Sequence, residues 1–255
     1  MAQMKVLKAK ITSITSSFRY PQIMVGKIPT FEMPPPATIY GHLCGILGEW
    51  FDQTALQFSY NFKYKSRCYD KELIHVVGVA GGKYEYDGQI YKKNIEGNTN
   101  VQNREFLFDT EMILYLKGDD DIIKKLYDKF GDIEYSYILG RSQDLATCQS
   151  YEIIEIEESK ICFFENTLLP WDFRKKTVKG FPIMMPKYVD YNNYRQPVFE
   201  RYLQISKGEI LVYPSKDDFI FIENEEKESF FTDKSEIKMI NGNEYYKGLY
   251  FHGFK

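Results

Sequence analysis

The stretch 34–51 reads Pro34-Pro35-Pro36-Ala37-Thr38-Ile39-Tyr40-Gly41-His42-Leu43-Cys44-Gly45-Ile46-Leu47-Gly48-Glu49-Trp50-Phe51, and it organises the first half of the chain. Proline cannot sit inside a helix but can open one, so the triplet predicts a helix from Ala37 to about Phe51. Its apolar residues recur at helical spacing on one face. Gly41, Gly45 and Gly48 each cost about 1 kcal/mol relative to alanine within a helix. Such a smooth ridge suits close approach by a packed sheet or by a nucleic-acid backbone, and both interpretations stay open.

The segments around this helix predict an α+β fold. Period-two alternation predicts strands at 3–17, 57–69, 105–117 and 151–157, with a second helix that opens at Asp119 before the last of them. The polar stretch 81–104 contains Asp87-Gly88, a signal for a hairpin, and we expect this hairpin to project. The resulting order is strand, helix, strand, hairpin, strand, helix, strand. It is close to the split βαβ arrangement of the ferredoxin-like fold.

The last third of the chain has a different character. Short β-type runs such as 209–213 and 218–222 predict a smaller, mainly β region. A length of 255 residues allows one large domain or two small ones. We therefore expect a ferredoxin-like domain over 1–158, with the hairpin inserted near 81–104, and a small mainly β region over 159–255.

Composition excludes several classes of protein. With 44% hydrophobic and 27% charged residues, the chain can bury a core and is not intrinsically disordered. No apolar run approaches the roughly 18–20 residues of a membrane helix, and the first residues lack the hydrophobic segment of a signal peptide. The 4 cysteines and 3 histidines are too scattered for a metal site. We expect a cytosolic protein with reduced thiols, no metal and no other cofactor.

Charge is unevenly distributed along the chain. The formal net charge of −3 does not suggest a nucleic-acid partner. Residues 1–104, however, carry 13 basic and 8 acidic side chains, and residues 170–207 carry 8 and 3. The intervening residues 105–169 carry 6 and 15. Such alternation fits a protein with one face toward a polyanion and also fits ordinary variation on a solvated surface.

Two segments are more specific than composition. The first runs from Ser17-Phe18-Arg19-Tyr20-Pro21 to the proline-led helix start at 34–41, with Gly45 and Gly48 after it. The second is Leu139-Gly140-Arg141-Ser142-Gln143-Asp144-Leu145. In this order, they resemble the Cas5 family of CRISPR-associated proteins, with features of its type I-B branch. That family belongs to the RAMP superfamily of ferredoxin-like RNA binders, and the resemblance covers the chain to about residue 150.

The resemblance implies a non-catalytic, RNA-binding subunit of a type I CRISPR surveillance complex, Cascade. Members of the family cap the 5′ handle of the crRNA and contact the Cas7-type backbone subunit and the Cas8-type large subunit. Target DNA is then met only indirectly, within the complex, and no membrane is involved. A hairpin thumb kinks the guide near the handle boundary, and 81–104 is the candidate thumb here because of its place in the order of elements.

Handle recognition requires cationic donors and stacking surfaces, because single-stranded RNA presents phosphates and unstacked bases. The free N–H groups at the start of the 37–51 helix suit a phosphate, and a glycine at position 41 permits close approach. The residues expected to contact RNA are Arg19, Tyr20, Lys27, Thr38, Tyr40, Gly41, Lys63, Lys65, Arg67, Arg141 and Ser142.

Several of these residues carry an alternative interpretation. Tyr40 suits the core as well as it suits RNA. Arg141 would also pair with Asp144, three residues later. The basic strand face of Lys63, Lys65 and Arg67 also fits a solvated edge strand.

Two other functions remain as alternatives to a binding subunit. The type I-C branch of the family cuts precursor crRNA without metal, with tyrosine, lysine and histidine side chains. The corresponding candidates here are Tyr40, His42, Lys65 and His75, but no adjacent Lys-His pair is present and both histidines lie in apolar surroundings. A scaffold that contacts only protein would also explain the 16% aromatic content.

Overall fold

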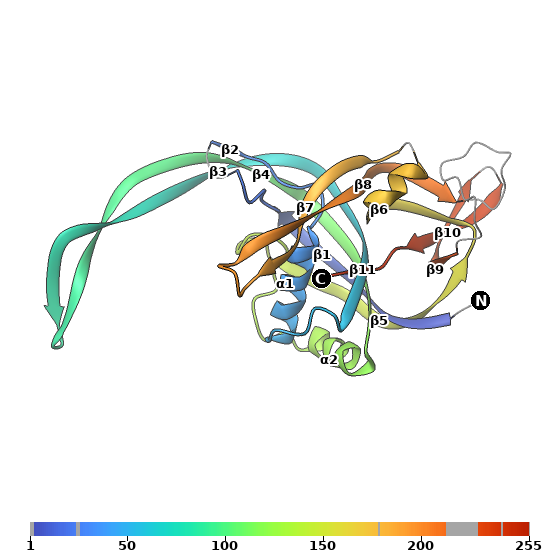
Figure 1. Ribbon diagram of the computed structural model, residues 1–255, viewed down its shortest axis with the longest axis horizontal. Helices are drawn as coiled ribbons and strands as arrows, with labels where there is room; N and C mark the ends of the chain where they lie inside the picture. The colour runs from blue at the N-terminus through green and yellow to red at the C-terminus, as the bar shows by residue number, and fades with distance from the viewer. Residues whose placement is uncertain (1–2, 24–25, 178, 213–228, 241, 255) are drawn as a thin grey trace.

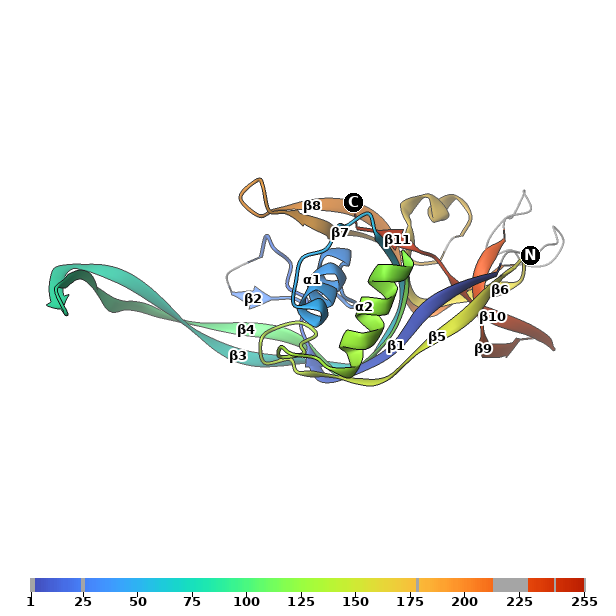
Figure 2. The same cartoon turned by 90° about the horizontal axis from the view of Figure 1, so that it is seen from below.

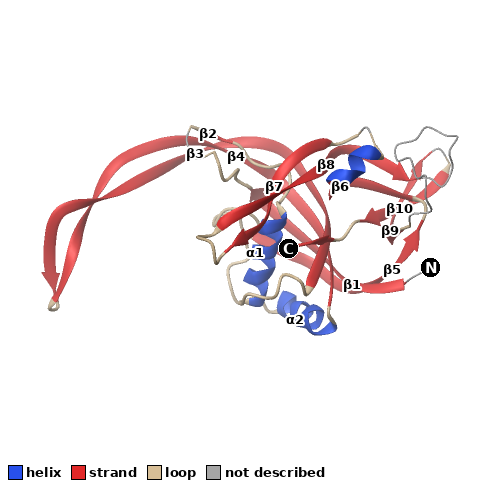
Figure 3. Ribbon diagram, viewed as in Figure 1, coloured by secondary structure: helices blue, strands red, loops and turns tan. Residues whose placement is uncertain are grey.

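The computed structural model describes residues 3–23, 26–177, 179–212, 229–240 and 242–254. The molecule has an α+β fold dominated by strands, as predicted (Figure 3). Its elements in chain order are β1 (Gln3–Ser16), β2 (Lys27–Ile28), α1 (Pro36–Leu47), β3 (Leu56–Tyr86), β4 (Gln89–Gly118), α2 (Asp120–Gly131), β5 (Ala146–Ser159), β6 (Cys162–Pro170), the 3-10 helix η1 (Trp171–Lys175), β7 (Phe181–Asp190), β8 (Gln196–Val212), β9 (Phe230–Ile240), β10 (Asn243–Leu249) and β11 (His252–Gly253).

Strand pairing connects the two halves of the chain. The order is β11-β3-β4-β1-β5-β9-β10-β6-β8-β7, and β2 pairs with β4 outside this path. Strand β1 runs antiparallel to both of its neighbours, β4 and β5. Both helices lie on one side of the β3-β4-β1-β5 part, and α1 lies between that part and the β7–β8 hairpin (Figure 2). Helix α1 is thus held from two sides, which fixes the position of its exposed face.

The main core lies between the helices and this part of the sheet. The helical periodicity of 37–51 is what buries Ile39, Leu43 and Ile46 against the sheet. Alternate residues of β1, including Leu7, Ala9 and Ile11, face the same cluster because side chains alternate across a strand. Burial of several such side chains, each worth roughly 1.5–3 kcal/mol, fixes α1 on the sheet.

Helix α1 is shorter than the predicted 37–51. It ends at Leu47 because Gly48 adopts a left-handed conformation, with φ of 73°, and donates its N–H to the carbonyl of Cys44 at 2.9 Å. Gly48 is therefore the residue that stops the helix and not part of its surface. Trp50 and Phe51 lie in the connection that follows.

The predicted hairpin is present and is longer than the 81–104 insertion. Pairing between β3 and β4 extends from Leu56–Gly118 at the base to Tyr86–Gln89 at the tip, with register shifts near residues 76 and 80. The turn is Asp87-Gly88, as predicted, and both residues have positive φ. The predicted strands 57–69 and 105–117 are the inner halves of these two strands. The outer half projects far from the body (Figure 1).

The remaining elements also run beyond their predicted limits. Strand β5 covers 146–159 instead of 151–157, and its last residues, 157–159, pair with β9. The sheet therefore continues through residue 158, and the division of the chain into two units there stays a prediction. The run 209–213 coincides with the end of β8 as far as Val212, whereas 218–222 lies outside the described residues.

None of the helices in the described part of the chain has the length and apolar character of a membrane crossing. All 4 cysteines are free thiols. Within the described ranges, no three histidine, cysteine or carboxylate side chains are grouped as metal ligands.

Candidate functional site

The two segments singled out in the sequence meet at one cavity of about 600 Å³. This size lies within the range of roughly 300–1,000 Å³ that ligand sites occupy. The cavity lies where β1 ends, beside the start of α1 and the inner part of the hairpin. Its lining residues are Ser17, Phe18, Arg19, Pro21, Ile28, Thr38, Glu72, Ile74, Gln102, Arg104, Gly140, Arg141 and Gln143.

Gly140 explains how the second segment reaches the first. Its φ of 133° lies in the region that favours glycine. A Cβ at this position would lie 2.7 Å from the backbone nitrogen of Ser17 and 2.7 Å from Oδ2 of Asp144. Both distances are too short for any side chain, so only glycine lets the 140–144 turn pack on the end of β1.

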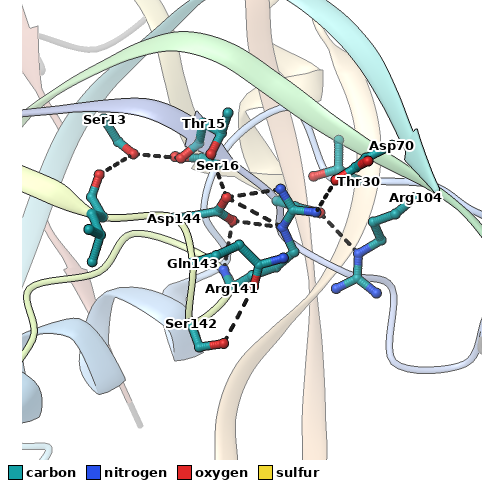
Figure 4. A network of polar contacts seen from close by, with 12 residues as sticks. Ser13, Thr15, Ser16, Thr30, Asp70, Arg104, Arg141, Ser142, Gln143 and Asp144 are labelled. Atoms are coloured by element: carbon teal, nitrogen blue, oxygen red, sulfur yellow. Dashed lines mark hydrogen bonds and ion pairs between the residues drawn. The ribbon is translucent and has the colours of Figure 1, made fainter. Parts of the chain in front are cut away.

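Asp144 ties this turn to β1 (Figure 4). The carboxylate is fully buried and accepts a hydrogen bond of 2.7 Å from the Thr15 hydroxyl. It also accepts the backbone N–H of Arg141 at 2.8 Å and the Arg141 guanidinium at 3.0–3.3 Å. A buried carboxylate needs this many donors to offset the loss of water. Asp144 therefore fixes the geometry of the cavity wall.

Arg141 is held by acidic neighbours. Its side chain is only 8% exposed, and Nη1 lies 2.9 Å from Oε1 of Glu72 in addition to the contacts with Asp144. Burial alone would lower the pKa of the guanidinium, but the hydrogen bonds and charges of Asp144 and Glu72 raise it. The ion pair with Asp144, one of the two interpretations from the sequence, is confirmed. Direct RNA contact by Arg141 stays a prediction.

Arg104 is the cavity residue that sequence reasoning missed. Its Nε donates to Oγ of Ser17 at 3.4 Å, and Nη1 lies 3.7 Å from Oε2 of Glu72. Burial lowers the pKa of this guanidinium, so its charge is incompletely compensated. Arg19, which was predicted, is exposed at the same cavity. Three guanidinium groups thus surround a cavity whose lining contains one carboxylate, that of Glu72.

The glycine face of α1 opens onto a neighbouring cavity of about 290 Å³. A Cβ at Gly41 or Gly45 would meet no atom of the described chain within 4 Å. A packed sheet therefore does not explain why these positions lack side chains. Thr38 and Gly140 line both cavities, so the glycine face continues the larger one.

The start of α1 differs from the predicted row of free donors. Pro34, Pro35 and Pro36 have no N–H, and Thr38 donates its N–H to the carbonyl of Pro35 at 2.8 Å. The N–H of Ile39 also points to this carbonyl, at 3.2 Å. The helix thus presents the Thr38 side chain and the smooth Gly41 surface to the cavity, but few backbone donors.

His42, a candidate catalytic residue, is a buried structural histidine. Its Nδ1–H donates to the carbonyl of Ile138 at 2.8 Å, and the Tyr137 hydroxyl donates to Nε2 at 3.0 Å. Burial lowers the pKa of the imidazole to about 4. Both nitrogens are occupied in holding the 137–138 segment against α1.

We expect the burial of His42 to make folding pH-dependent. The imidazole takes up a proton near pH 6.5 in the unfolded chain but only near pH 4 in the folded one, so its contribution is complete above pH 6.5 and is lost toward pH 4. The loss is on the order of 3 kcal/mol for His42, and His252, whose pKa is also about 4, adds a similar dependence. The free energy of unfolding is measured by urea denaturation at pH 7, 6 and 5. In His42→Asn it should fall with pH about half as steeply as in the wild type. An unchanged dependence on pH would contradict the burial of a neutral His42.

The other residues predicted to contact RNA differ in burial and in their contacts within the fold. Tyr40 is a core residue, 5% exposed, whose hydroxyl donates to the carbonyl of Phe51 at 2.6 Å. Tyr20 stacks on Phe31, Ser142 is exposed, and the Lys27 ammonium lies 4.4 Å from the centre of the Tyr69 ring. Tyr20, Lys27 and Ser142 do not line the cavity, but each is adjacent in sequence to a residue that does.

The basic strand face forms a second cavity of about 510 Å³. Lys63, Lys65 and Arg67 line it, and Arg67 pairs with Glu32. This cavity shares no lining residue with the one at Arg104. The predicted contact residues therefore divide between two places on the surface, a separation that strand alternation alone did not indicate.

Comparisons with known proteins identify a family that covers both of these places. A family model described as CRISPR-associated protein (Cas_Cas5) matches residues 6–149, more than half of the chain and both segments. No curated protein is similar enough to count as a relative.

Several solved structures are similar in fold at low identity. One is a chain of a CRISPR RNA-guided surveillance complex, with 12% identity over 78% of this chain and 90% of that chain and a TM-score of 0.49. A CRISPR protein from Archaeoglobus fulgidus has 10% identity over 84% and 93%, with a TM-score of 0.42. A chain of the Type III-B Cmr-beta complex bound to cognate target RNA has 12% identity over 82% and 86%, with a TM-score of 0.41.

Proposed function

Because the chain belongs to the Cas5 family of CRISPR-associated proteins, we propose that it is a non-catalytic, RNA-binding subunit of a type I surveillance complex. In this role it caps the 5′ handle of the crRNA and joins the Cas7-type backbone subunit to the Cas8-type large subunit. The observation that carries the proposal is the cavity between the two family segments, with Arg19, Arg104 and Arg141 around it.

The chemistry of this cavity suits an RNA phosphate. Arginine presents a planar fork of N–H donors that matches phosphate oxygens. Glu72 lies between Arg104 and Arg141, and Asp144 also pairs with Arg141. These two carboxylates offset two of the three guanidinium groups, which leaves one positive charge in excess for a phosphate to compensate. The larger cavity continues onto the Gly41 surface, where a sugar–phosphate chain could pass without meeting a side chain.

The architecture supports the family assignment of fold and thumb. The strand order β5-β1-β4-β3, with α1 after β1 and α2 after β4, supports a ferredoxin-like fold for this part of the chain. We propose that the outer half of the β3–β4 hairpin is the thumb. It carries Lys83 and Lys92 beside the stacked rings of Tyr84 and Tyr91, whose centres lie 5.4 Å apart. Charge next to exposed aromatic rings is the combination that single-stranded RNA requires.

The burial and hydrogen bonding of the candidate catalytic residues favour RNA binding over RNA cleavage. Metal-free RNA cleavage needs a base near the 2′-hydroxyl and a proton donor for the leaving oxygen. His42 has both nitrogens engaged inside the fold, and burial raises the pKa of the Tyr40 hydroxyl well above its ordinary value. The endoribonuclease alternative then rests on His75 and Lys65, which are both exposed on β3 and do not line the Arg104 cavity.

Substitution of Gly41 separates a role in RNA binding from a role in folding. Gly41→Leu should stabilise the free chain by up to about 1 kcal/mol, because leucine has the higher helix propensity and the space is open. It should weaken binding of repeat-derived handle RNA by about tenfold or more, because the side chain would occupy the path of the backbone. Filter binding and thermal denaturation of the same preparation check both expectations.

Lys125→Leu, on the exposed surface of α2, is the matched control and should leave RNA affinity unchanged. Full repeat RNA recovered from the binding mixture should be uncut. Unchanged affinity in Gly41→Leu, or equal affinity of the wild type for handle and scrambled RNA, would contradict handle recognition. A protein-only scaffold would show no RNA binding that weakens steeply with salt, and its apolar contacts with protein would depend little on salt.

A further inference from the structure

Strand β5 has a long open edge. Residues 146–156 pair with β1 on one side. On the other side the Ala146 N–H donates to the carbonyl of Tyr137 at 2.9 Å, and beyond it the described chain offers no strand partner until 157–159 meet β9. Figures 1 and 2 both place β5 along the outer margin of the molecule. An edge of this kind presents a row of backbone N–H and C=O groups that an added strand can bind.

The opposite end of the strand order shows how this chain protects an edge. Strand β7, which pairs only with β8 among the described strands, carries Pro182 and Pro186. Proline lacks the N–H that an added strand would need. Strand β5 contains no proline, and its stretch 150–156 follows β1 without a register shift. The β5 edge is therefore flat and unprotected where the β7 edge is blocked.

An apolar pocket of about 300 Å³ adjoins this edge. It lies between α2 and the β1–β5 part of the sheet, with Ile123, Tyr127 and Ile153 as its apolar walls. Ile153 is 44% exposed and Tyr127 is 40% exposed, so the pocket is open at the β5 side. Tyr127 is held in place by Tyr151 of β5, whose ring centre lies 5.0 Å from that of Tyr127.

The charge along the open edge of β5 indicates which kind of strand would bind there. Glu152 and Glu155 are the charged residues of 150–156 and both are exposed, so the open edge itself carries negative charge. The lysines opposite them, Lys8 and Lys5, lie on β1, on the side away from this edge. The charged residues that line the pocket are Lys5, Asp120 and Lys124. Antiparallel pairing with a second copy of this chain would bring four carboxylates into one short strand pair, with Glu152 opposite Glu155 in the register centred between residues 153 and 154, which is unfavourable across paired strands. A segment with lysine or arginine side chains would instead be attracted.

We propose that 150–156 of β5 binds an extended, basic segment of another protein as an added strand, with one apolar side chain of that segment in the pocket beside Ile153. Main-chain hydrogen bonds would supply affinity, and the pocket would set the register. This surface shares no lining residue with the Arg104 cavity. The choice of partner, a protein subunit of the same surveillance complex, rests on the proposed function.

Amide hydrogen exchange tests the added strand directly. The full chain would be compared alone and within the complex assembled on crRNA and purified through a tag on another subunit. Alternate amides of 150–156, those that face away from β1, should exchange about tenfold or more slowly in the complex. Equal exchange rates in the two states would overturn the proposal. A homodimer protected at 150–156 in the isolated chain would also overturn it, in favour of a second copy as occupant.

Two variants test the pocket and the charge. Ile153→Arg and Glu155→Lys should each lower incorporation of the chain into the complex by about tenfold. Ile237→Arg, at a 51% exposed position of β9, is the matched control and should assemble normally. Binding of handle RNA by each isolated variant is measured in parallel, so that retained RNA affinity with lost assembly supports this surface alone. Normal assembly of both folded variants would overturn the pocket and its charge preference.

Discussion

Replacing Arg141 by alanine is expected to lower the free energy of unfolding by about 3–5 kcal/mol. The guanidinium is 8% exposed and bonds Asp144, whose carboxylate is fully buried. Removal of one partner from a buried pair leaves the other charge buried without a counter-charge. The free-energy cost of that unpaired charge is larger than the stability that the intact pair contributes. Urea denaturation monitored by circular dichroism measures the loss. The pair is therefore expected to stabilise the wall of the cavity in addition to any contact with RNA.

A second substitution separates the buried charge from other effects. In the double variant Arg141→Gln with Asp144→Asn, the uncompensated charge is absent, so a large part of the lost stability should return. Arg174→Ala, at a surface ion pair with Asp172, is the control and should change stability by less than about 1 kcal/mol. A loss below about 1 kcal/mol in Arg141→Ala would show that the pair does not hold the 140–144 turn.

Joint replacement of Arg19 and Arg104 by glutamine is expected to weaken handle RNA binding by about 100-fold or more. Each charged hydrogen bond is worth about 1.5–3 kcal/mol, and 1.4 kcal/mol corresponds to a factor of ten. The fold should be retained, because Arg19 is exposed and glutamine at position 104 keeps an N–H donor for Ser17. Glu72, the acidic partner of the buried Arg104, also keeps its contact with Arg141 and is not left unpaired. Fluorescence anisotropy with labelled handle RNA, repeated over a salt series, measures the change.

The salt series identifies the kind of contact that is lost. Removal of two phosphate contacts should reduce the slope of log affinity against log salt by about 1.4, since each contact to a single strand contributes about 0.7. Lys124→Gln with Lys125→Gln, on the exposed face of α2, removes the same charge elsewhere and should leave affinity and slope nearly unchanged. Equal effects of the two double variants would contradict a specific site at Arg19 and Arg104.

Local patterns in the sequence were sufficient for the elements that position the site. The apolar spacing after Pro36 predicted the buried face of α1, and Asp87-Gly88 predicted the tip of the hairpin. Each of these two predictions depends on the conformational preference of a few adjacent residues. The segments 17–21 and 139–145 were singled out by their resemblance to a family instead, and the structure places residues of both at one cavity.

The contacts that shape the cavity depend on pairing between distant parts of the chain. Arg104 lies at the end of a polar stretch, and only the pairing of β4 with β1 and β3 brings it to Ser17 and Glu72. The sequence offered Asp144 as a partner for Arg141 but gave no sign of its burial, which follows from the contact with Thr15. The Thr38 N–H donates a hydrogen bond to the carbonyl of Pro35 and is not free for a ligand. The spacing of the prolines did not indicate this detail of the backbone path.

Site-specific photocrosslinking tests most directly whether the guide's first nucleotides lie in the cavity between the two family segments. The assembled complex would be prepared with 4-thiouridine at single positions of the crRNA handle, irradiated and digested for mass spectrometry. The expected crosslinks fall within peptides that contain 17–21, 38–45 or 140–143. Handle crosslinks confined to the hairpin tip or to β6–β10, with none in these three segments, would contradict the proposed site.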